Sequence, residues 1–414
     1  MQYLITNHAP TGGDLRLRTI ARYHGWGMTE ANLTAKIHSA MADIPADEWD
    51  SLLAPGQPHL KHSFLNIAET SGSVSNETGW QPCHITLRQN GRLVGAMPLY
   101  QKSHSWGEFI FDWSWAQAYQ RAGLPYYPKL VSASPFTPAT SQKLLLASDA
   151  GIGIQDALLQ VAIGFAKEHR FSSLHLQFLP EDERTMASNS GLLMRKDCQF
   201  HWFNRDYQDF GDFLATFSSK KRKNVNRERR RVREAGIEHR IVHGDSLTET
   251  NMRDAWRLCS YTFFARGHDP YLNLDFFLAL MQQPDSPLVV VLAERAGAPV
   301  AAAILLRGED VLLGRYWGSE KDYHSLHFET CYYQGIDYCI AEGIQRYEPG
   351  TQGEHKIARG FVPTETGSAH WLAEPAFADA IADYLSREAE GVDAYMEGVT
   401  QHVPYRQDDG DPAA

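Results

Sequence analysis

The chain has 414 residues, of which 43% are hydrophobic and 21% are charged. These are enough apolar side chains for two hydrophobic cores and too many for a disordered protein. The formal net charge of −11 argues against general affinity for DNA, and no segment approaches the roughly 18 uninterrupted apolar residues of a membrane span.

The distribution of polar and apolar residues predicts four regions. Residues 1–33 are polar and turn-rich, so we expect a loose extension, and they lack the apolar core of a signal peptide. Residues 34–199 and 200–402 each have the length of one domain, and residues 403–414 form a polar tail. Five cysteines without a CxxC pair are typical of a reducing compartment, so we expect a cytoplasmic protein.

Apolar spacing predicts strands and helices in both domains. In the first domain, we expect a strand and a helix start in 34–50, a helix in 61–75, a hairpin in 84–103, a strand in 129–138, a helix in 154–168 and a strand in 172–179. In the second, we expect helices in 209–235, 250–264, 274–283, 327–342 and 376–399, strands in 237–242 and 311–318, and a hairpin in 289–307. The fold class is therefore α/β (α+β), with a mixed central sheet flanked by helices in each domain.

The two hairpins are similar to one another. Each consists of an apolar run, a glycine turn and a second apolar run, and Gly91 corresponds to Gly297 at an offset of 206 residues. A repeat at this distance indicates two similar domains. A small residue, Ala96 or Ala302, follows where the chain enters the second strand. This arrangement resembles the hairpin of acyl-CoA-dependent N-acyltransferases, in which a strand edge stays open for a pantetheine arm.

A basic run is the sharpest local signal. Nine of the fourteen residues from Lys220 to Arg233 are basic. On a helix, one face carries Lys220, Lys223, Arg227 and Arg230, and another carries Arg222, Arg229 and Arg233. These side chains could bind phosphates of coenzyme A, of a nucleotide-linked substrate or of a tRNA acceptor stem. The alternative is a solvated helix facing the acidic remainder of the chain.

A glycine-rich segment, GTQGEHKIARGF at 350–361, concentrates four ionisable residues. His355 or Glu354 is a candidate general base, whereas Lys356 and Arg359 would hold an anion. The alternative is a turn with exposed charges. Around it in sequence, Tyr316 is a candidate acid for the leaving group, and Arg315, His327 and Glu329 are candidate substrate-binding residues; as isolated residues, they are more often structural.

A block of aromatic and charged residues between 104 and 129 could form a partly wet pocket for a polar organic substrate. Its candidate members are His104, Glu108, Asp112, Trp113, Tyr126, Tyr127 and Lys129. An aromatic core with polar residues at its rim is the alternative. The chain contains no GxSxG, Walker or HExxH motif, so no metal is expected.

These segments together resemble a bacterial family of N-acyltransferases described as peptidoglycan biosynthesis or recognition proteins and related to FemAB-type peptidyltransferases. The resemblance is carried by TGWQPCHITLRQNGRLVGAMPLY, GRYWG, LHFETCYYQGIDY and EPGTQGEHKIARGF, and it covers about residues 34–405. It implies two tandem GNAT-like domains. It also implies that Gly353 and Lys356 correspond to the glycine-rich turn and lysine of the FemAB-type relatives, and that residues 220–233 correspond to their basic helix.

We therefore expect an N-acyltransferase that moves an acyl or aminoacyl group onto an amine of a small molecule or peptide. The expected donor is acyl-CoA, and open main-chain N–H groups near Ala302 would polarise its carbonyl group. Two alternatives stay open: an aminoacyl-tRNA-dependent ligase, and a non-catalytic protein that binds a cell-wall precursor. No segment corresponds to the inserted helical arm of FemAB-type enzymes, which weakens the first alternative.

Overall fold

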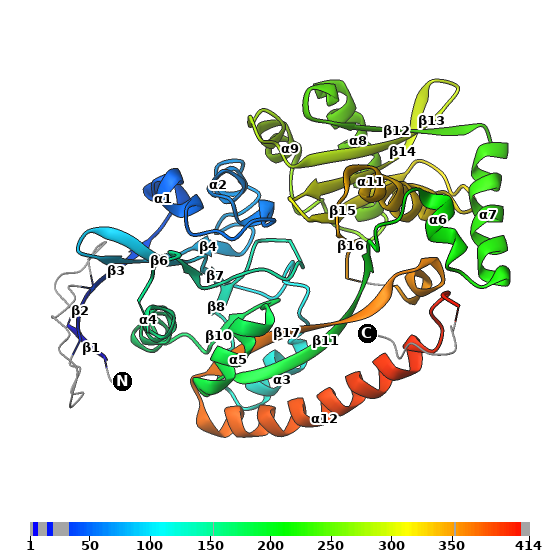
Figure 1. Ribbon diagram of the computed structural model, residues 1–414. Helices are drawn as coiled ribbons and strands as arrows, with labels where there is room; N and C mark the ends of the chain where they lie inside the picture. The colour runs from blue at the N-terminus through cyan, green and yellow to red at the C-terminus, as the bar shows by residue number, and fades with distance from the viewer. Residues whose placement is uncertain (1–2, 7–14, 20–32, 152, 352, 407–414) are drawn as a thin grey trace. The chain divides into compact units, whose positions relative to one another are not determined.

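The computed structural model describes residues 3–6, 15–19, 33–151, 153–351 and 353–406 (Figure 1). Contacts divide the chain into two compact units. Unit 1 comprises Met1–Lys196 and Thr366–Ala389, and unit 2 comprises Asp197–Glu365 and Glu390–Ala414. The first change of unit lies close to the domain boundary expected at 199/200, and a later segment of the chain also belongs to unit 1.

Unit 1 contains two groups of paired strands. One has the order β1-β2-β3-β5-β6-β9, and the other has the order β4-β7-β8-β10-β17. The strands are β1 (Tyr3–Thr6), β2 (Leu15–Thr19), β3 (Leu33–His38), β4 (Trp80–Pro82), β5 (His84–Gln89), β6 (Arg92–Met97), β7 (Tyr100–Lys102), β8 (Lys129–Ser132), β9 (Leu145–Leu146), β10 (Ser173–Leu176) and β17 (Val362–Leu372), whose second half belongs to this unit. Within the extension expected at 1–33, the described residues form β1, β2 and, at Leu33, the start of β3. The others lie outside the described part of the chain, as do 407–414 of the expected tail.

The helices of unit 1 are α1 (Ala46–Asp50), α2 (His62–Thr70), α3 (Trp113–Arg121), α4 (Ile154–Glu168) and α5 (Glu181–Asn189), with short 3-10 turns η1 (Met41–Asp43) and η2 (Pro58–Leu60). The apolar face of α4 packs on β5, β6 and β10. Ala157, Leu158 and Val161 are buried there with Ile85 and Leu87 of β5. This packing explains why the helical spacing in 154–168 was informative.

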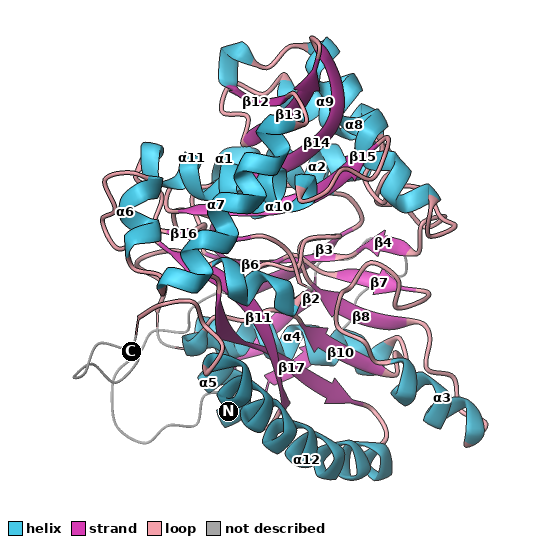
Figure 2. Cartoon of the chain, turned by 90° about the vertical axis from the view of Figure 1, so that its right-hand side faces the viewer, coloured by secondary structure: helices cyan, strands magenta, loops and turns pink. Residues whose placement is uncertain are grey.

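Unit 2 is built on strands in the order β12-β13-β14-β15-β16-β11. These are β11 (Leu193–Phe203), which begins in unit 1, β12 (Ile237–His243), β13 (Leu288–Arg295), β14 (Ala298–Arg307), β15 (Val311–Ser319) and β16 (Arg346–Glu348). The helices are α6 (Phe210–Ala215), α7 (Ser219–Glu234), α8 (Glu249–Phe264), α9 (Leu274–Met281), α10 (Leu326–Phe328), the π-helix η4 (Glu329–Tyr333) and α11 (Gln334–Glu342). The 3-10 turns η3 (Gly244–Ser246) and η5 (Glu354–Arg359) and the long helix α12 (Pro375–Thr400), which runs through both units, complete the fold (Figure 2).

Helices cover both faces of the unit 2 sheet. Helix α8 packs on β14 and β15, so closely that a Cβ atom added to Gly318 would lie 2.0 Å from the Leu258 carbonyl oxygen. On the opposite face, Tyr332, Tyr333 and Ile336 join a core with residues of β13 and β14. Within the described residues, no helix is both long and apolar enough to cross a bilayer.

The duplicated hairpin expected from the sequence is present in both units. Asn90 and Gly91 have φ values of 52° and 85°, and Ala296 and Gly297 have values of 51° and 76°. Two consecutive positive φ values suit the two-residue turn that matches strand twist. The register also shifts at the same place, at Leu87/Arg88 and at Ala293/Glu294, again 206 residues apart. The prediction of a mixed α/β fold with a repeated core is thus confirmed.

Candidate functional site in unit 2

Two buried ionisable residues of unit 2, Glu348 and Lys356, lie at the end of β16 and shortly after it. Strands β15 and β16 are parallel neighbours through three pairs, of which Leu313–Glu348 is the last. The chain then leaves the sheet through Pro349 and Gly350, whose φ is 104°. Gly314 of β15 lies against this turn, because an added Cβ would be 3.0 Å from Pro349 Cα. Ligands of open α/β sheets bind at this kind of carboxyl end.

Glu348 has a buried carboxyl group at this strand end. It is 4% exposed, its Oε1 lies 2.9 Å from Nε of Arg346, and its Oε2 lies 4.0 Å from Nε2 of His201 on β11. Burial raises the pKa of Glu348 to about 7, although Arg346 acts in the opposite direction. A carboxyl group with this pKa can exchange a proton at neutral pH. Glu348 is not among the residues predicted from the sequence, although its place before Pro-Gly at a strand end was an available signal.

Lys356 lies in η5, the short helix that follows. Its side chain is buried, and the ammonium group donates a hydrogen bond to the Gly350 carbonyl oxygen. Burial lowers the pKa of Lys356 to about 7, and no carboxylate contributes to the shift. Gly353 has a φ of 113°, and an added Cβ would lie 2.2 Å from the His355 ring. The turn therefore requires glycine at this position.

The two residues expected as general bases lie at the surface. Glu354 is exposed, and its carboxylate accepts a hydrogen bond from the Tyr395 hydroxyl at 3.1 Å. His355 is also exposed, with Nε2 2.8 Å from the Tyr332 hydroxyl. Burial, together with Arg359 and Lys356, lowers its pKa. His327 is half-buried against His355, and burial lowers its pKa to about 4. The roles of Glu354 and His355 as bases, and of His327 in substrate binding, stay predictions.

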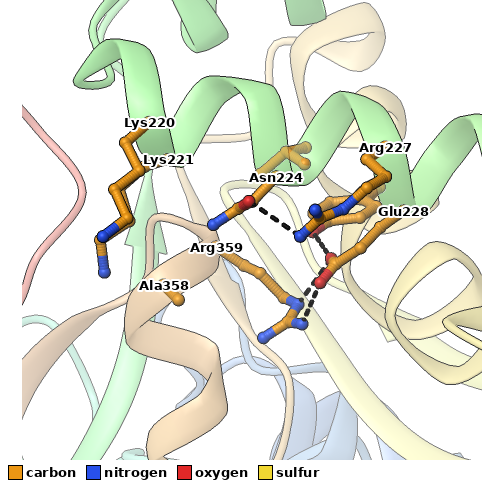
Figure 3. A pocket seen from close by; sticks show the side chains of 9 residues that line it. Lys220, Lys221, Asn224, Arg227, Glu228, Ala358 and Arg359 are labelled. Atoms are coloured by element: carbon orange, nitrogen blue, oxygen red, sulfur yellow. Dashed lines mark hydrogen bonds and ion pairs between the residues drawn. The ribbon is translucent and has the colours of Figure 1, made fainter.

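A cationic pocket of about 250 Å³ lies between α7 and η5 (Figure 3). Lys220, Lys221 and Arg227 reach it from α7, and Arg227 is oriented by a 3.0 Å hydrogen bond to the Asn224 side chain. The remaining lining residues are Val225, Glu228, Tyr333, Ala358 and Arg359. Three cations around a small cavity suit a phosphate group.

Not all cations expected to bind phosphate line this pocket. Arg222 and Lys223 lie outside its lining, and Arg230 pairs with Glu234 on the surface. Arg229 is bound by Glu329 at 3.1 Å and by Asp337 at 2.7 Å. Glu329 is therefore buried as an ion-pair partner of the basic helix, and the expected substrate-binding role stays a prediction.

Arg359, expected to hold an anion, already has a carboxylate. Its Nη2 lies 2.7 Å from Oε1 of Glu228, and its guanidinium carbon is 3.3 Å from the centroid of the Phe328 ring. The Tyr333 hydroxyl donates to the same carboxylate. Glu228 thus neutralises Arg359 in the lining of the pocket. The cations that stay available for an anion there are those of α7.

The expectation of open N–H groups near Ala302 is wrong. Ala302 pairs with Leu292 on one side and with Gly318 on the other, and its carbonyl oxygen also accepts a bond from the Cys259 thiol. Strand β14 pairs with β13 on one side and with β15 on the other, so its main-chain groups face a neighbouring strand on both sides. The separation of strands occurs instead after the third pair of β15 and β16.

Tyr316 is packed in an aromatic cluster. Its ring lies 4.7 Å from that of Phe263 and 5.5 Å from that of Phe277. The hydroxyl accepts a 2.7 Å bond from the Leu272 N–H, and burial raises its pKa. These contacts give the phenol a structural task and do not favour proton donation to a leaving group.

The charged residues of the aromatic block meet in the interior of unit 1. The ammonium group of Lys129 is 2.9 Å from Glu108 Oε2 and also binds Asp112. Tyr126 donates to Asp112 at 2.5 Å, and Tyr127 lies near the ammonium group. Burial raises the pKa of Glu108, whereas for Lys129 the two carboxylates outweigh burial and raise the pKa. This arrangement is a buried ion cluster with aromatic walls.

The two other candidates of this block lie outside the cluster. The Trp113 ring packs on Trp106 at 5.4 Å, and the His104 ring packs where a Gly79 Cβ would be. A hydrogen-bonded chain instead extends from Tyr126 to His175, which lies 2.6 Å from His370 between their Nδ1 atoms. These histidines are not among the residues predicted from the sequence, because their partners come from distant strands.

Comparison with known proteins is consistent with this architecture. The FemAB_like family model, described as peptidoglycan biosynthesis/recognition, matches residues 40–407. No curated protein sequence matches the chain. The solved structure of FemX is similar with a TM-score of 0.53 and 11% identity, over 82% of this chain and 98% of that chain.

A second similar structure is the C-terminal DUF2156 domain of a predicted lysylphosphatidylglycerol synthetase from Agrobacterium fabrum. Its TM-score is 0.52 with 9% identity, over 89% of this chain and 100% of that chain. A tandem GNAT protein from the clavulanic acid pathway has a TM-score of 0.43 with 14% identity, over 83% and 99% of the two chains. At these identities, the first two likenesses show a common fold.

Proposed function

The chain belongs to the FemAB_like family of peptidoglycan biosynthesis/recognition, and we propose that it transfers an acyl group from acyl-CoA to an amine at the end of β16. One observation carries the proposal. The short segment from Glu348 to Arg359 joins a buried carboxyl group, a buried lysine and one wall of a cationic pocket. Acyl transfer needs a base, a proton donor and a site for the donor's phosphates.

Glu348 serves as the base in this proposal. The amine nitrogen attacks the thioester carbon, the new N–C bond forms, the C–S bond breaks, and the amine proton passes to the Glu348 carboxylate. The departing thiolate takes a proton from Lys356, whose pKa of about 7 permits donation at neutral pH. This assignment replaces the exposed Glu354 and His355, and the hydrogen-bonded Tyr316, with two buried groups.

The cationic pocket holds phosphates of the donor in this proposal. Lys220, Lys221 and Arg227 supply three positive charges, whereas Glu228 neutralises Arg359. The volume of about 250 Å³ accommodates a phosphate or diphosphate rather than a whole nucleotide. The rest of coenzyme A would extend outside it.

A matched pair of variants tests the donor site. K220Q/K221Q removes two pocket charges, whereas K223Q/R230Q removes two charges of the same helix outside the pocket lining. We expect isothermal titration to show coenzyme A binding to the wild type and to K223Q/R230Q, with about tenfold weaker binding to K220Q/K221Q. Equal binding by all three proteins would remove the pocket from the proposal.

An aminoacyl-tRNA donor is the second candidate, favoured by the cations of α7 that lie outside the pocket. These include the exposed residues Lys223, Arg230, Arg231 and Arg233. A polyanion that contacts them would show a steep dependence of affinity on salt. For this donor, K223Q/R230Q would weaken binding as much as K220Q/K221Q, and RNase would abolish transfer. Binding of a muropeptide without any response to coenzyme A or tRNA would indicate the non-catalytic alternative.

A further inference from the structure

We propose that Arg315 is an anion-recognition residue, which binds a carboxylate or phosphate group of a molecule that enters unit 2 where β15 leaves β16. This inference rests on the proposed function only where it identifies that molecule as the acyl donor or the amine acceptor. Anion binding by Arg315 can be measured without any transfer reaction, so the two ideas can fail separately.

Arg315 is the extra residue of a β-bulge. In the pairing of β14 with β15, Leu305 is opposite Gly314 and Ile304 is opposite Tyr316, so Arg315 has no partner in the register. A bulge redirects the side chain that it carries, and bulges are frequent next to active sites. The bulge follows immediately after Gly314, which lies against the turn at Pro349. The backbone of Arg315 therefore lies where the two strands separate.

The guanidinium group of Arg315 has no anion. Among the described residues, none forms an ion pair or hydrogen bond with it, and its Nε is buried without a partner. The residue as a whole is half-buried. Burial lowers the pKa of Arg315 to about 10, which keeps it charged at neutral pH. Its neighbours on β14, Ile304 and Leu305, are apolar.

Three other arginines of unit 2 that are buried or half-buried are neutralised within the chain. Arg229 binds Glu329 and Asp337, Arg359 binds Glu228, and Arg307 binds Glu342 at 2.8 Å. Removing a cation from water without a counter-ion is costly. A guanidinium group presents paired donors that match the two oxygens of a carboxylate or phosphate. Arg315 thus differs from these three arginines, because no carboxylate of the described residues binds its guanidinium group.

The experiment uses the K220Q/K221Q background, so that the α7 pocket does not contribute. Isothermal titration with inorganic phosphate and with acetate is carried out on the background protein, which retains Arg315, and on the same background with R315Q, R315K or the control R307Q. We expect R315Q to weaken anion binding by about tenfold or more, which corresponds to one charge-assisted hydrogen bond. R315K should retain part of the affinity, and R307Q should retain all of it.

The two anions distinguish the source of the ligand. Preference for phosphate indicates the activated donor, and preference for acetate indicates the carboxylate of an acceptor. Circular dichroism confirms that each variant is folded, and R315M provides a second uncharged variant if R315Q is not. Equal anion affinity for Arg315 and a folded uncharged variant would overturn the proposal.

Discussion

Glu228 binds the guanidinium group of Arg359 through two contacts, with Nη2–Oε1 at 2.7 Å and Nε–Oε2 at 3.2 Å. The pair connects the basic helix α7 to η5 beneath a pocket whose other charges are positive. Glu228 therefore has two effects: it stabilises the contact between these elements, and it reduces the positive charge of the pocket.

We expect E228Q to separate these effects. The loss of a largely buried charged partner should lower the free energy of unfolding by roughly 1–3 kcal/mol, measured by urea denaturation. The released positive charge should strengthen phosphate binding several-fold at low salt. E234Q on the same helix is the control, because the Arg230–Glu234 pair is exposed and contributes little. Unchanged phosphate affinity in E228Q would show that Glu228 does not shield the pocket.

The rate of transfer should depend on the ionisation of Glu348. A carboxyl group with a pKa of about 7 is protonated below that pH, so the acidic limb of the rate profile should rise toward neutrality. Lys356 must keep its proton to donate it, and its pKa is also about 7, so the rate should fall again at higher pH. R346Q removes the cation that favours the Glu348 carboxylate, so it should move the midpoint of the acidic limb of the rate profile to higher pH. E348Q should lower kcat by about 100-fold or more.

Infrared difference spectroscopy provides a control that does not need a substrate. A carboxyl band should titrate near neutral pH in the wild-type protein and lose the contribution of Glu348 in E348Q, whereas the contribution of Glu183, whose pKa burial also raises to about 7, should remain. If the midpoint of the rate profile stays fixed in R346Q, Glu348 is not the base. His201 and Asp310 also lie near this carboxyl group and are unchanged in both variants.

Replacement of Lys129 should destabilise unit 1. K129M leaves the carboxylates of Glu108 and Asp112 buried without their common cation. Breaking a buried ion pair on one side costs about 3–5 kcal/mol, and thermal unfolding should detect this loss. The control K36M changes an exposed lysine of β3 and should have a small effect. A small effect of K129M would mean that the carboxyl groups are neutral.

Gly318 should not tolerate a side chain. In G318A, the Cβ would lie 2.0 Å from the Leu258 carbonyl oxygen and 2.5 Å from Cys259 Cα, so α8 would have to move away from β15. We expect a loss of about 3 kcal/mol in urea denaturation. G391A provides the opposite case, since its Cβ meets nothing within 4 Å on the exposed face of α12. That variant should gain about 1 kcal/mol through helix propensity.

Strong local patterns made much of the fold predictable from the sequence. The hairpins around Gly91 and Gly297 combine apolar runs with a turn signal, and α4, α8 and α12 show clear helical spacing. Strands β11 and β17 were missed because their buried positions are often polar. His370 and Ser368, for example, satisfy each other's hydrogen bonds within β17. A burial pattern created by such pairs cannot be recognised from apolar spacing.

The site was less predictable than the fold. The basic character of α7 is evident from its sequence. Which of its faces lines the pocket, however, depends on the direction in which the buried side chains of Val225 and Val232 pack. These two valines are the only apolar residues of the helix, and their positions could have indicated its buried side. The environment of Glu348 depends on β11 and β15, which are remote in sequence. Its pKa is therefore a property of tertiary structure.

The equivalent hairpins create a problem of self-recognition during folding. Two ribbons with the same turn and the same bulge can each dock in the wrong sheet, a hazard of chains with internal repeats. Buried polar contacts distinguish them: Thr86 on β5 bonds His38 at 2.9 Å, whereas β13 offers only aliphatic side chains along its buried length. A second-unit ribbon in the first sheet would leave His38 without this hydrogen bond, so the contact favours the arrangement in which each copy pairs within its own unit.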